Sequence, residues 1–498
     1  MDTQELQFTW MDDMLERIST AYINVGDLQT DKPVIILLHG THGTIEDMRD
    51  PGAMPEPFNC QKIRDGTLVN RGWNWYPALG PIWGFTGGEP MTVTGWEPYL
   101  NAHGYPTINY SQVGPTETIQ RPVAELRGLL QAVVEHRLFV DREIVLMGHS
   151  RGGIVARKVL VDLANDALAS VPRAAKVLGA IKRLFMLHAP NRGSSLANQS
   201  IETNRVLMHR DLMLAAATMI LIPFAGPVAA GVLWYLIDRV LDDIKKTVET
   251  PAFSDFAVGS PTLRSLASQE PVQGIEYYTW GGNNPRVFWF GAWIFTPLSV
   301  LPQPQWPPFN WETSFFGSLP VPPDLGGVLP KEMRYEVGDV LVTGVNAHLS
   351  FSQAITNPLN HAEALWDPII QYQVVSILKH GEVRMGPPMV KHDVPAKLYI
   401  SIILPDSSSD DDRTIDLYSG SDSNGIPWAL TALEALELMN QGHRFFALTP
   451  HDRPVGVRAV KMRGSQRVYL RTAANGTVRL ADLPRMKISI QTNRTNER

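Results

Sequence analysis

The sequence has little cysteine, no net positive charge and no basic, apolar leader at its start. Its one cysteine, Cys60, excludes an intrachain disulfide and a cysteine-rich zinc site. A formal net charge of −6 argues against a nucleic-acid binder that works by neutralising phosphates. The first five residues carry two acidic side chains, Asp2 and Glu5, and no basic one, so we expect no secretory signal and a cytoplasmic location.

The composition is that of a globular protein. Of the 498 residues, 44% are apolar and 19% are charged, which supplies a sizeable core and excludes a mostly disordered chain. At about 150 residues per domain, the length suggests roughly three domain-equivalents. One large α/β domain followed by a small second domain fits this length equally well.

One stretch is long and apolar enough to suggest a membrane span. Leu212 through Ile237 carries no charged residue. Pro223 and Pro227 interrupt it, and proline breaks a helix because it lacks the N–H donor. We therefore predict two apolar helices joined by a turn, which cover something apolar. Insertion into a membrane, or docking on its surface, is the alternative.

Short apolar runs alternate with segments of helical spacing along the first four-fifths of the chain. This alternation predicts a mostly parallel sheet with helices on both faces. The expected strands are 33–40, Gly104–Tyr110, Glu143–Met147, Ile181–Leu187, Gly274–Trp280 and Tyr335–Val342. The expected helices are Trp96–Ala102, Glu117–His136, Ile154–Leu163 and about 362–378. Between about 50 and 95 we expect an irregular excursion with a small hairpin.

Two domains are predicted. Residues 1–392 form the α/β domain, with an insertion at about 196–333 that interrupts the alternation. Residues 393–498 form a small α+β domain of unknown role, beyond a proline-containing linker. Its expected helix is Trp428–Met439, and its expected strands are Leu398–Leu404, Phe445–Leu448, Val455–Val460 and Arg467–Leu470.

The strongest motif is Gly148-His149-Ser150-Arg151-Gly152, between a predicted strand and a predicted helix. In this context a Gly-x-Ser-x-Gly sequence places the serine on a tight, strained turn, where its hydroxyl is exposed above the sheet. Glycine at 148 and 152 lets neighbouring backbone approach the turn. Ser150 is therefore the predicted nucleophile, and the alternative is a serine that merely caps the helix.

A nucleophilic serine needs two N–H donors for the developing oxyanion. The N–H of Arg151, directly after the nucleophile, is one candidate. The loop after the strand 33–40 is the expected source of the other, and Thr41 is our candidate within it.

The serine also needs a histidine base and a carboxylate that orients this base, in the chain order Ser, Asp or Glu, His. His361 precedes the last helix of the main domain and is the predicted base, with His348 as the rival. Asp339 is the predicted acid. Glu336 and Asp324 are the alternatives, and an aspartate that only bonds its own turn is the structural alternative.

These motifs resemble the α/β-hydrolase superfamily and, within it, the bacterial triacylglycerol lipases. The resemblance spans about 30–380 and rests on Leu37–Gly40, Gly148–Gly153, His188–Ala197, Gly338–Val342 and Asn360–His361. It implies an α/β-hydrolase fold with a helical lid and hydrolysis of carboxylic esters. It also implies the same site: Ser150, Asp339 and His361, with Thr41 and Arg151 as oxyanion donors.

The sequence thus predicts a serine hydrolase, a lipase or esterase that acts through an acyl-enzyme on an apolar or lipid-like ester. Apolar segments at 205–247 and 286–316 would form the lid and the acyl pocket, and the lid could contact a lipid interface transiently. An acyltransferase or an amide or lactone hydrolase would use the same triad, and a non-catalytic binding protein is a further alternative. We expect no cofactor, no metal and no nucleic-acid partner.

Overall fold

The structure is a computed structural model of the chain. It describes residues 3–25, 31–51, 62–65, 68–69, 88–91, 94–198, 250–283, 331–333, 337–339, 341–357, 359–384, 397–405, 415–422, 427–430, 432–440, 443–448, 454–461, 468–472 and 487–489. The predicted helical hairpin at 212–237 and the predicted lid and acyl-pocket segments, 205–247 and 286–316, lie outside the described residues.

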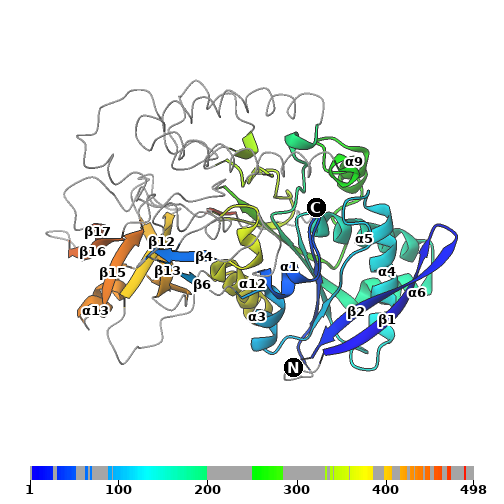
Figure 1. Cartoon of the computed structure of the whole chain (residues 1–498), viewed down its shortest axis with the longest axis horizontal. Helices are drawn as coiled ribbons and strands as arrows, with labels where there is room; N and C mark the ends of the chain where they lie inside the picture. The colour runs from blue at the N-terminus through cyan, green and yellow to red at the C-terminus, as the bar shows by residue number, and fades with distance from the viewer. Residues whose placement is uncertain are drawn as a thin grey trace, which may run out of the picture.

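A nine-stranded sheet forms the centre of the larger body (Figure 1). Its strand order is β1-β2-β7-β3-β8-β9-β10-β11-β18. The six strands from β7 to β11 in this order are parallel, and β1, β2 and β18 are antiparallel to their neighbours. The strands are β1 (Thr3–Asp12), β2 (Leu15–Asn24), β3 (Val34–Leu38), β7 (Thr107–Asn109), β8 (Ile144–His149), β9 (Ile181–Leu187), β10 (Glu276–Gly282), β11 (Gln353–Asn357) and β18 (Lys487–Ser489).

The register of the parallel strands aligns their carboxyl ends. Leu38 pairs with Gly148, and His149 pairs with Leu187. Gly282 in turn pairs with Asn357. The loops that follow these strands therefore begin at one edge of the sheet, where ligands bind in open α/β sheets.

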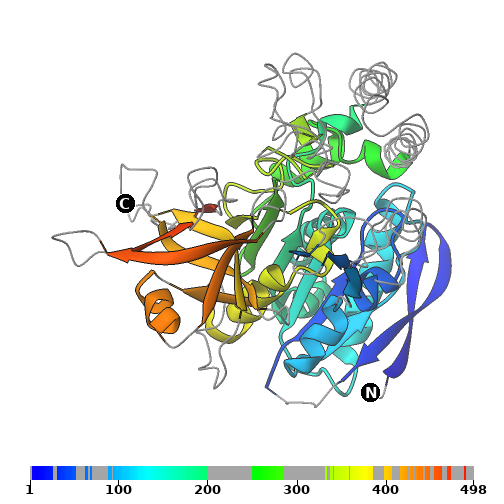
Figure 2. The ribbon, with the colours of Figure 1, turned by 60° about the vertical axis from the view of Figure 1, so that its left-hand side comes forward.

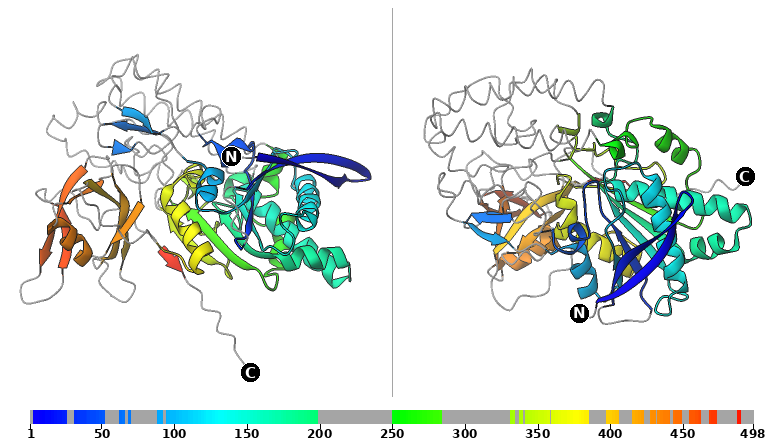
Figure 3. Two further views of the ribbon diagram at one scale, coloured as in Figure 1. Left: turned by 90° about the horizontal axis from the view of Figure 1, so that it is seen from below. Right: turned by 45° about the vertical axis from the view of Figure 1, so that its right-hand side comes forward.

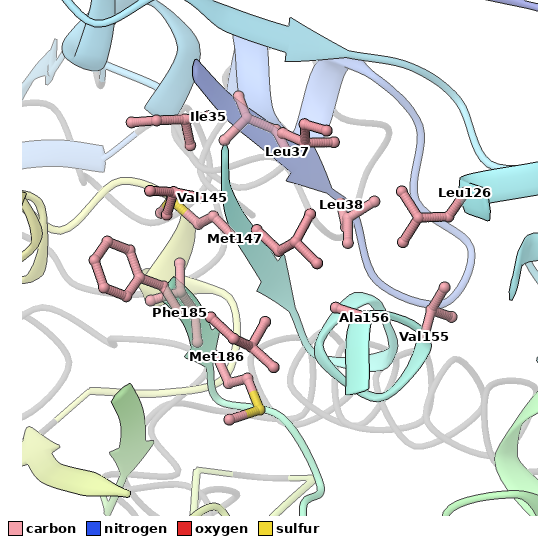
Figure 4. Close-up of a cluster of buried hydrophobic side chains, with 14 of the residues drawn as sticks. Ile35, Leu37, Leu38, Leu126, Val145, Met147, Val155, Ala156, Phe185 and Met186 are labelled. Carbon is pink, nitrogen blue, oxygen red and sulfur yellow. The ribbon is translucent and has the colours of Figure 1, made fainter. Parts of the chain in front are cut away.

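Helices cover both faces of this sheet (Figure 1). Helices α4 (Gln120–Glu135), α5 (Arg151–Leu168) and α6 (Pro172–Ala180) pack together on one side, and α3 (Trp96–Ala102) packs with α12 (Pro368–His380) on the other. Apolar side chains of β3, β8 and β9 fill the interior beside α5 (Figure 4). No helix in the described part of the chain is long and apolar enough to cross a membrane.

The alternation read from the sequence is confirmed, and several bounds agree closely: α3 and β9 coincide with the predicted ranges. The strand expected at Tyr335–Val342 is wrong. In the described part of this stretch Gly338 bridges to Thr343 across a turn, and the strand that enters the sheet is β11. The predicted helix at Trp428–Met439 is half wrong, because its first residues form β14 (Pro427–Leu430) and the helix α13 covers Ala432–Asn440.

A second, six-stranded sheet lies beyond α12, in the order β14-β13-β12-β15-β16-β17 (Figure 2). Its other strands are β12 (Lys397–Pro405), β13 (Ile415–Asp422), β15 (Arg444–Leu448), β16 (Pro454–Lys461) and β17 (Val468–Thr472). It has its own apolar cluster, which includes Tyr418, Ala435 and Phe445. The chain then returns to the main sheet, where β18 pairs with β11.

Two smaller features complete the fold. The β1–β2 hairpin extends along the far edge of the main sheet (dark blue in Figure 3). Between β3 and α3 lies a three-stranded sheet, β5-β4-β6, made of Lys62–Asp65, Leu68–Val69 and Gly88–Met91.

Candidate active site

Ser150 lies at the junction of β8 and α5, on a strained turn. Its backbone angles are φ 52° and ψ −123°, outside the regions that a residue with a side chain normally occupies. Its N–H donates to the carbonyl of Leu187 at 2.9 Å, and its own carbonyl accepts from Gly153 at 3.1 Å. The turn is thus fixed from the strand on one side and the helix on the other.

Two glycines make this turn possible. A side chain on Gly148 would place its Cβ 2.4 Å from the carbonyl carbon of Gly152. A side chain on Gly152 would place its Cβ 2.4 Å from the carbonyl oxygen of Leu38. These distances leave no room for any other residue, as the Gly-x-Ser-x-Gly motif requires.

His361 and Asp339 meet at the same edge of the sheet. The Nδ1 of His361 lies 3.0 Å from Oδ2 of Asp339, and the His361 N–H donates to the Asp339 carbonyl at 2.8 Å. The other carboxylate oxygen, Oδ1, accepts from the N–H groups of Leu341 and Val342. Asp339 therefore closes its own turn with one oxygen and holds the histidine with the other.

His149 connects this pair to Ser150. Its Nε2 donates to the carbonyl of His361 at 2.9 Å, and the two rings lie 5.0 Å apart. Since His149 directly precedes Ser150, this bond brings the loop of His361 against the turn of the serine. The Nε2 of His361 is buried and makes no hydrogen bond with a described residue.

Asp339 is held in its charged form. Burial alone would raise the pKa of this carboxyl, but the imidazoles of His361 and His188 keep the pKa well below its ordinary value. The Nδ1 of His361 is then the protonated nitrogen, because an ionised carboxylate accepts and does not donate. This tautomer leaves Nε2 of His361 as the acceptor.

The rival histidine, His348, is engaged elsewhere. Its two ring nitrogens lie 2.9 Å from the hydroxyls of Thr279 and Thr356. Burial, with His188 and Arg192 nearby, lowers the pKa of His348 to about 4. The structure thus brings His361, and not His348, to Asp339. The alternative acids Glu336 and Asp324 lie outside the described residues.

The loop after β3 packs directly on Ser150. A Cβ on Gly40 would lie 3.1 Å from Cβ of Ser150 and 3.6 Å from its Oγ. His39 fixes this loop, because its Nδ1 donates to the Gly40 carbonyl and its Nε2 accepts from the N–H of Gln112. Thr41 follows Gly40, so its backbone lies within the same fixed turn.

Arg151 is fully buried although it carries a guanidinium group. Its Nη2 donates to the carbonyls of Gly114 and Glu117, at 2.9 and 3.0 Å, and more weakly to that of Thr118. The side chain therefore anchors a neighbouring loop. The backbone N–H of Arg151 belongs to the first turn of α5, where N–H groups have no partner within the helix.

Two further histidines at this edge were not singled out from the sequence. His149 stands at the variable position of the serine motif, and His188 directly follows β9. His188 Nδ1, Asp339 Oδ2 and His361 Nδ1 all lie within 4.8 Å of one another, and among the described residues this is the group that could hold a metal ion. The usable signal for His188 was its place directly after a parallel strand.

No protein-family model matches the chain, and no curated protein matches it in sequence. Solved structures resemble it in part. A lipase of Bacillus licheniformis in its mature form is 14% identical, covers 73% of this chain and 98% of its own, and has a TM-score of 0.35. An esterase of Pyrococcus furiosus is 10% identical, with coverages of 57% and 71% and a TM-score of 0.28. A thermophilic esterase of Thermogutta terrifontis is 13% identical, with coverages of 60% and 87% and a TM-score of 0.25.

The fold itself follows from the chain's own topology. The core of parallel strands and the strained serine turn after β8 agree with the sequence-based expectation. The chain has the α/β-hydrolase fold.

Proposed function

We propose that the protein is a serine hydrolase that cleaves carboxylic esters through an acyl-enzyme. One observation carries the proposal: a serine on a strained turn, a histidine and a buried carboxylate come from three distant segments and meet at one edge of the sheet. In this arrangement Ser150 is the nucleophile, His361 the base and Asp339 the group that orients the base.

In the acylation step, Oγ of Ser150 attacks the ester carbonyl carbon while its proton passes to Nε2 of His361. The imidazolium that forms is stabilised by Asp339, whose Oδ2 already accepts from Nδ1. Collapse of the tetrahedral intermediate breaks the bond to the leaving alkoxide, which takes the proton from Nε2. The alcohol leaves, and the acyl group remains on Ser150.

In the deacylation step, water attacks the acyl-enzyme and gives a proton to Nε2 of His361. Collapse of this second intermediate returns the proton to Oγ of Ser150 and releases the carboxylic acid. Both intermediates carry an oxyanion, for which we assign the N–H groups of Thr41 and Arg151. The packing of Gly40 on Ser150 and the position of Arg151 in the first turn of α5 support this assignment.

We further propose an apolar acyl group for the substrate. The support is compositional: the segments 205–247 and 286–316 are rich in apolar and aromatic residues, and both are inserted between strands that end at the site. A panel of p-nitrophenyl esters of increasing chain length, with and without an emulsion interface, tests this part.

The decisive experiment replaces the nucleophile. Ser150→Ala should lower the hydrolysis of p-nitrophenyl esters by about 10⁴-fold or more and abolish labelling by a fluorophosphonate probe, because no other group can form the acyl-enzyme. Ser265→Ala is the matched control, since Ser265 is an exposed serine in helix α9 (Pro261–Ala267) and should leave both readouts unchanged. Circular dichroism should show the same fold for both variants.

Two results would reject the proposal: a Ser150→Ala protein that still turns over esters, or a wild-type protein that a fluorophosphonate does not label. Product analysis with an added alcohol separates the hydrolase from an acyltransferase that uses the same triad. If an ester of the added alcohol is the main product, the protein is an acyltransferase.

A further inference from the structure

His188 occupies an unfavourable position beside the site. Its side chain is fully buried, and its Nε2 makes no hydrogen bond with a described residue. Its φ is +49°, in the left-handed region that non-glycine residues rarely adopt. A buried polar group without a hydrogen bond and a strained backbone both cost free energy. Apolar packing does not account for a histidine here.

The imidazole of His188 is directed at the catalytic carboxylate. Its Nδ1 lies 3.0 Å from Oδ2 of Asp339, the same oxygen that accepts from His361. Gly282, at the end of β10, makes the approach possible. A side chain there would place its Cβ 2.6 Å from Cε1 of His188 and 2.6 Å from Cβ of Asp339.

A carboxylate as deeply buried as that of Asp339 needs several donors to stay ionised. Its Oδ1 has the N–H groups of Leu341 and Val342, whereas Oδ2 has only side-chain nitrogens near it, from His361 and His188, among the described residues. If the support at Oδ2 were lost, the carboxylate would attract the proton of His361 Nδ1 more strongly, and its own position would be held only through Oδ1. A carboxylate that can turn would fix the orientation of the base less well.

We propose that His188 is a positioning residue of the catalytic triad: its imidazole supports Oδ2 of Asp339 and so keeps the carboxylate ionised and directed at His361. This inference rests on the proposed function, since it assigns His188 a role in the same site. In this role His188 acts through Asp339 and not on the reacting atoms.

Other titratable groups surround His188. The titratable neighbours of His188 are Asp339, His361, His149 and His348, and Arg192 lies near His348. Burial, followed by the charge of a protonated His361, holds the pKa of His149 well below its ordinary value, and burial lowers that of His348 to about 4. Both rings therefore stay neutral near neutral pH and add no charge beside Asp339.

The test compares two replacements. His188→Phe keeps a ring but removes the nitrogen that faces Asp339. His188→Asn keeps a donor, because its amide nitrogen can take the place of Nδ1, and asparagine tolerates a positive φ. We expect His188→Phe to lower kcat for a p-nitrophenyl ester by about 10- to 100-fold with KM nearly unchanged, the usual size of a hydrogen bond to a charged group.

The pH profile gives a second readout that a packing residue would not affect. Loss of a donor beside the carboxylate raises the proton affinity of the His361–Asp339 pair. The acid limb of kcat/KM should therefore move to higher pH, by about one unit, in His188→Phe. His188→Asn should restore the wild-type limb and recover kcat to within about threefold.

The inference is overturned if His188→Phe keeps the wild-type kcat and acid limb, or if the Asn and Phe variants lose activity equally. If the Phe variant does not fold, His188→Ala is a smaller replacement without a donor, and the same comparison applies. Titration of the His361 ring by NMR follows the pair without any substrate. It therefore tests His188 even if the wild-type protein hydrolyses no ester, an outcome that would reject the proposed function alone.

Discussion

At the scale of single residues, Asp339 has a structural contact on one carboxylate oxygen and the contact of its proposed catalytic role on the other. Oδ1 bonds the N–H groups of its own turn, which is the structural alternative considered from the sequence, while Oδ2 holds His361. The sequence indicated Ser150, Asp339 and His361 because each follows a recognisable pattern. It gave no sign of the contact between His188 and Asp339, because that contact depends on how three strands align.

Gly40 provides a residue-scale prediction about the oxyanion loop. In Gly40→Ala the new methyl group would lie 3.1 Å from Cβ of Ser150 and 3.2 Å from Nδ1 of His149, so the loop or the serine must shift. We expect kcat/KM for p-nitrophenyl esters to fall by about 10- to 100-fold, since displacements of this size disturb catalytic geometry. Thermal melting checks that the fold remains.

Gly179→Ala is the matched control for this experiment. Gly179 lies in α6, and a Cβ there would have no heavy atom within 4 Å. The substitution should leave activity unchanged and stabilise the helix by up to about 1 kcal/mol. Equal activity of the two variants would show that the loop after β3 has no part in catalysis.

At the scale of elements, the sequence was informative where packing follows local pattern. The buried parallel strands and amphipathic helices were predicted from apolar runs and helical spacing, as β9 and α4 show. The β1–β2 hairpin was missed because much of it is exposed and carries charge, which hides the alternation typical of a strand. The apolar Val-Leu-Val after Asp339 suggested a strand, but the carboxylate bonds the N–H groups that a strand would pair.

Helix α5 is fastened to the rest of the domain by a buried ion pair. Nε of Arg157 donates to Glu270 at 2.9 Å, and the two side chains are 1% and 0% exposed. Arg157→Met should lower the free energy of unfolding by about 3–5 kcal/mol, because it leaves a buried carboxylate unpaired. Urea denaturation measures this loss.

The double variant Arg157→Met with Glu270→Met separates the pair from the packing around it. Without either charge, the desolvation penalty disappears, and most of the lost stability should return. A double variant that is as unstable as the sum of the two single variants would show that the ion pair is not what fastens α5.

At the scale of the whole molecule, the buried histidines make stability depend on pH. Burial lowers the pKa of His39 and His348 to about 4, and burial with the charge of His361 nearby holds the pKa of His149 well below its ordinary value. In the unfolded chain these groups bind protons near pH 6.5. Below that value the unfolded state binds more protons, so stability falls as the pH decreases from about 6.5 towards 4.

For each of these histidines, the free energy of unfolding should fall by up to about 1.4 kcal/mol per unit decrease in pH. Asp47 has the opposite effect on stability. Burial raises the pKa of its carboxyl to about 6, so as the pH falls the folded state binds a proton before the unfolded state does and is stabilised. Urea denaturation at pH 7, 6 and 5 measures the net loss, and His39→Asn should reduce the slope by about one proton. Stability that is constant from pH 7 to 5 would contradict this account.

The return of the chain to the main sheet affects how the protein is made. Strand β18 covers the edge of β11, the strand that leads into the loop of His361, yet the whole six-stranded sheet is synthesised between the two. During synthesis β11 therefore remains an unpaired edge strand until the late residues emerge from the ribosome. Unpaired edge strands can pair with strands of other chains and so cause aggregation. Chains stalled before residue 487 should aggregate during translation, because the strand that leads to His361 is still unpaired on one side.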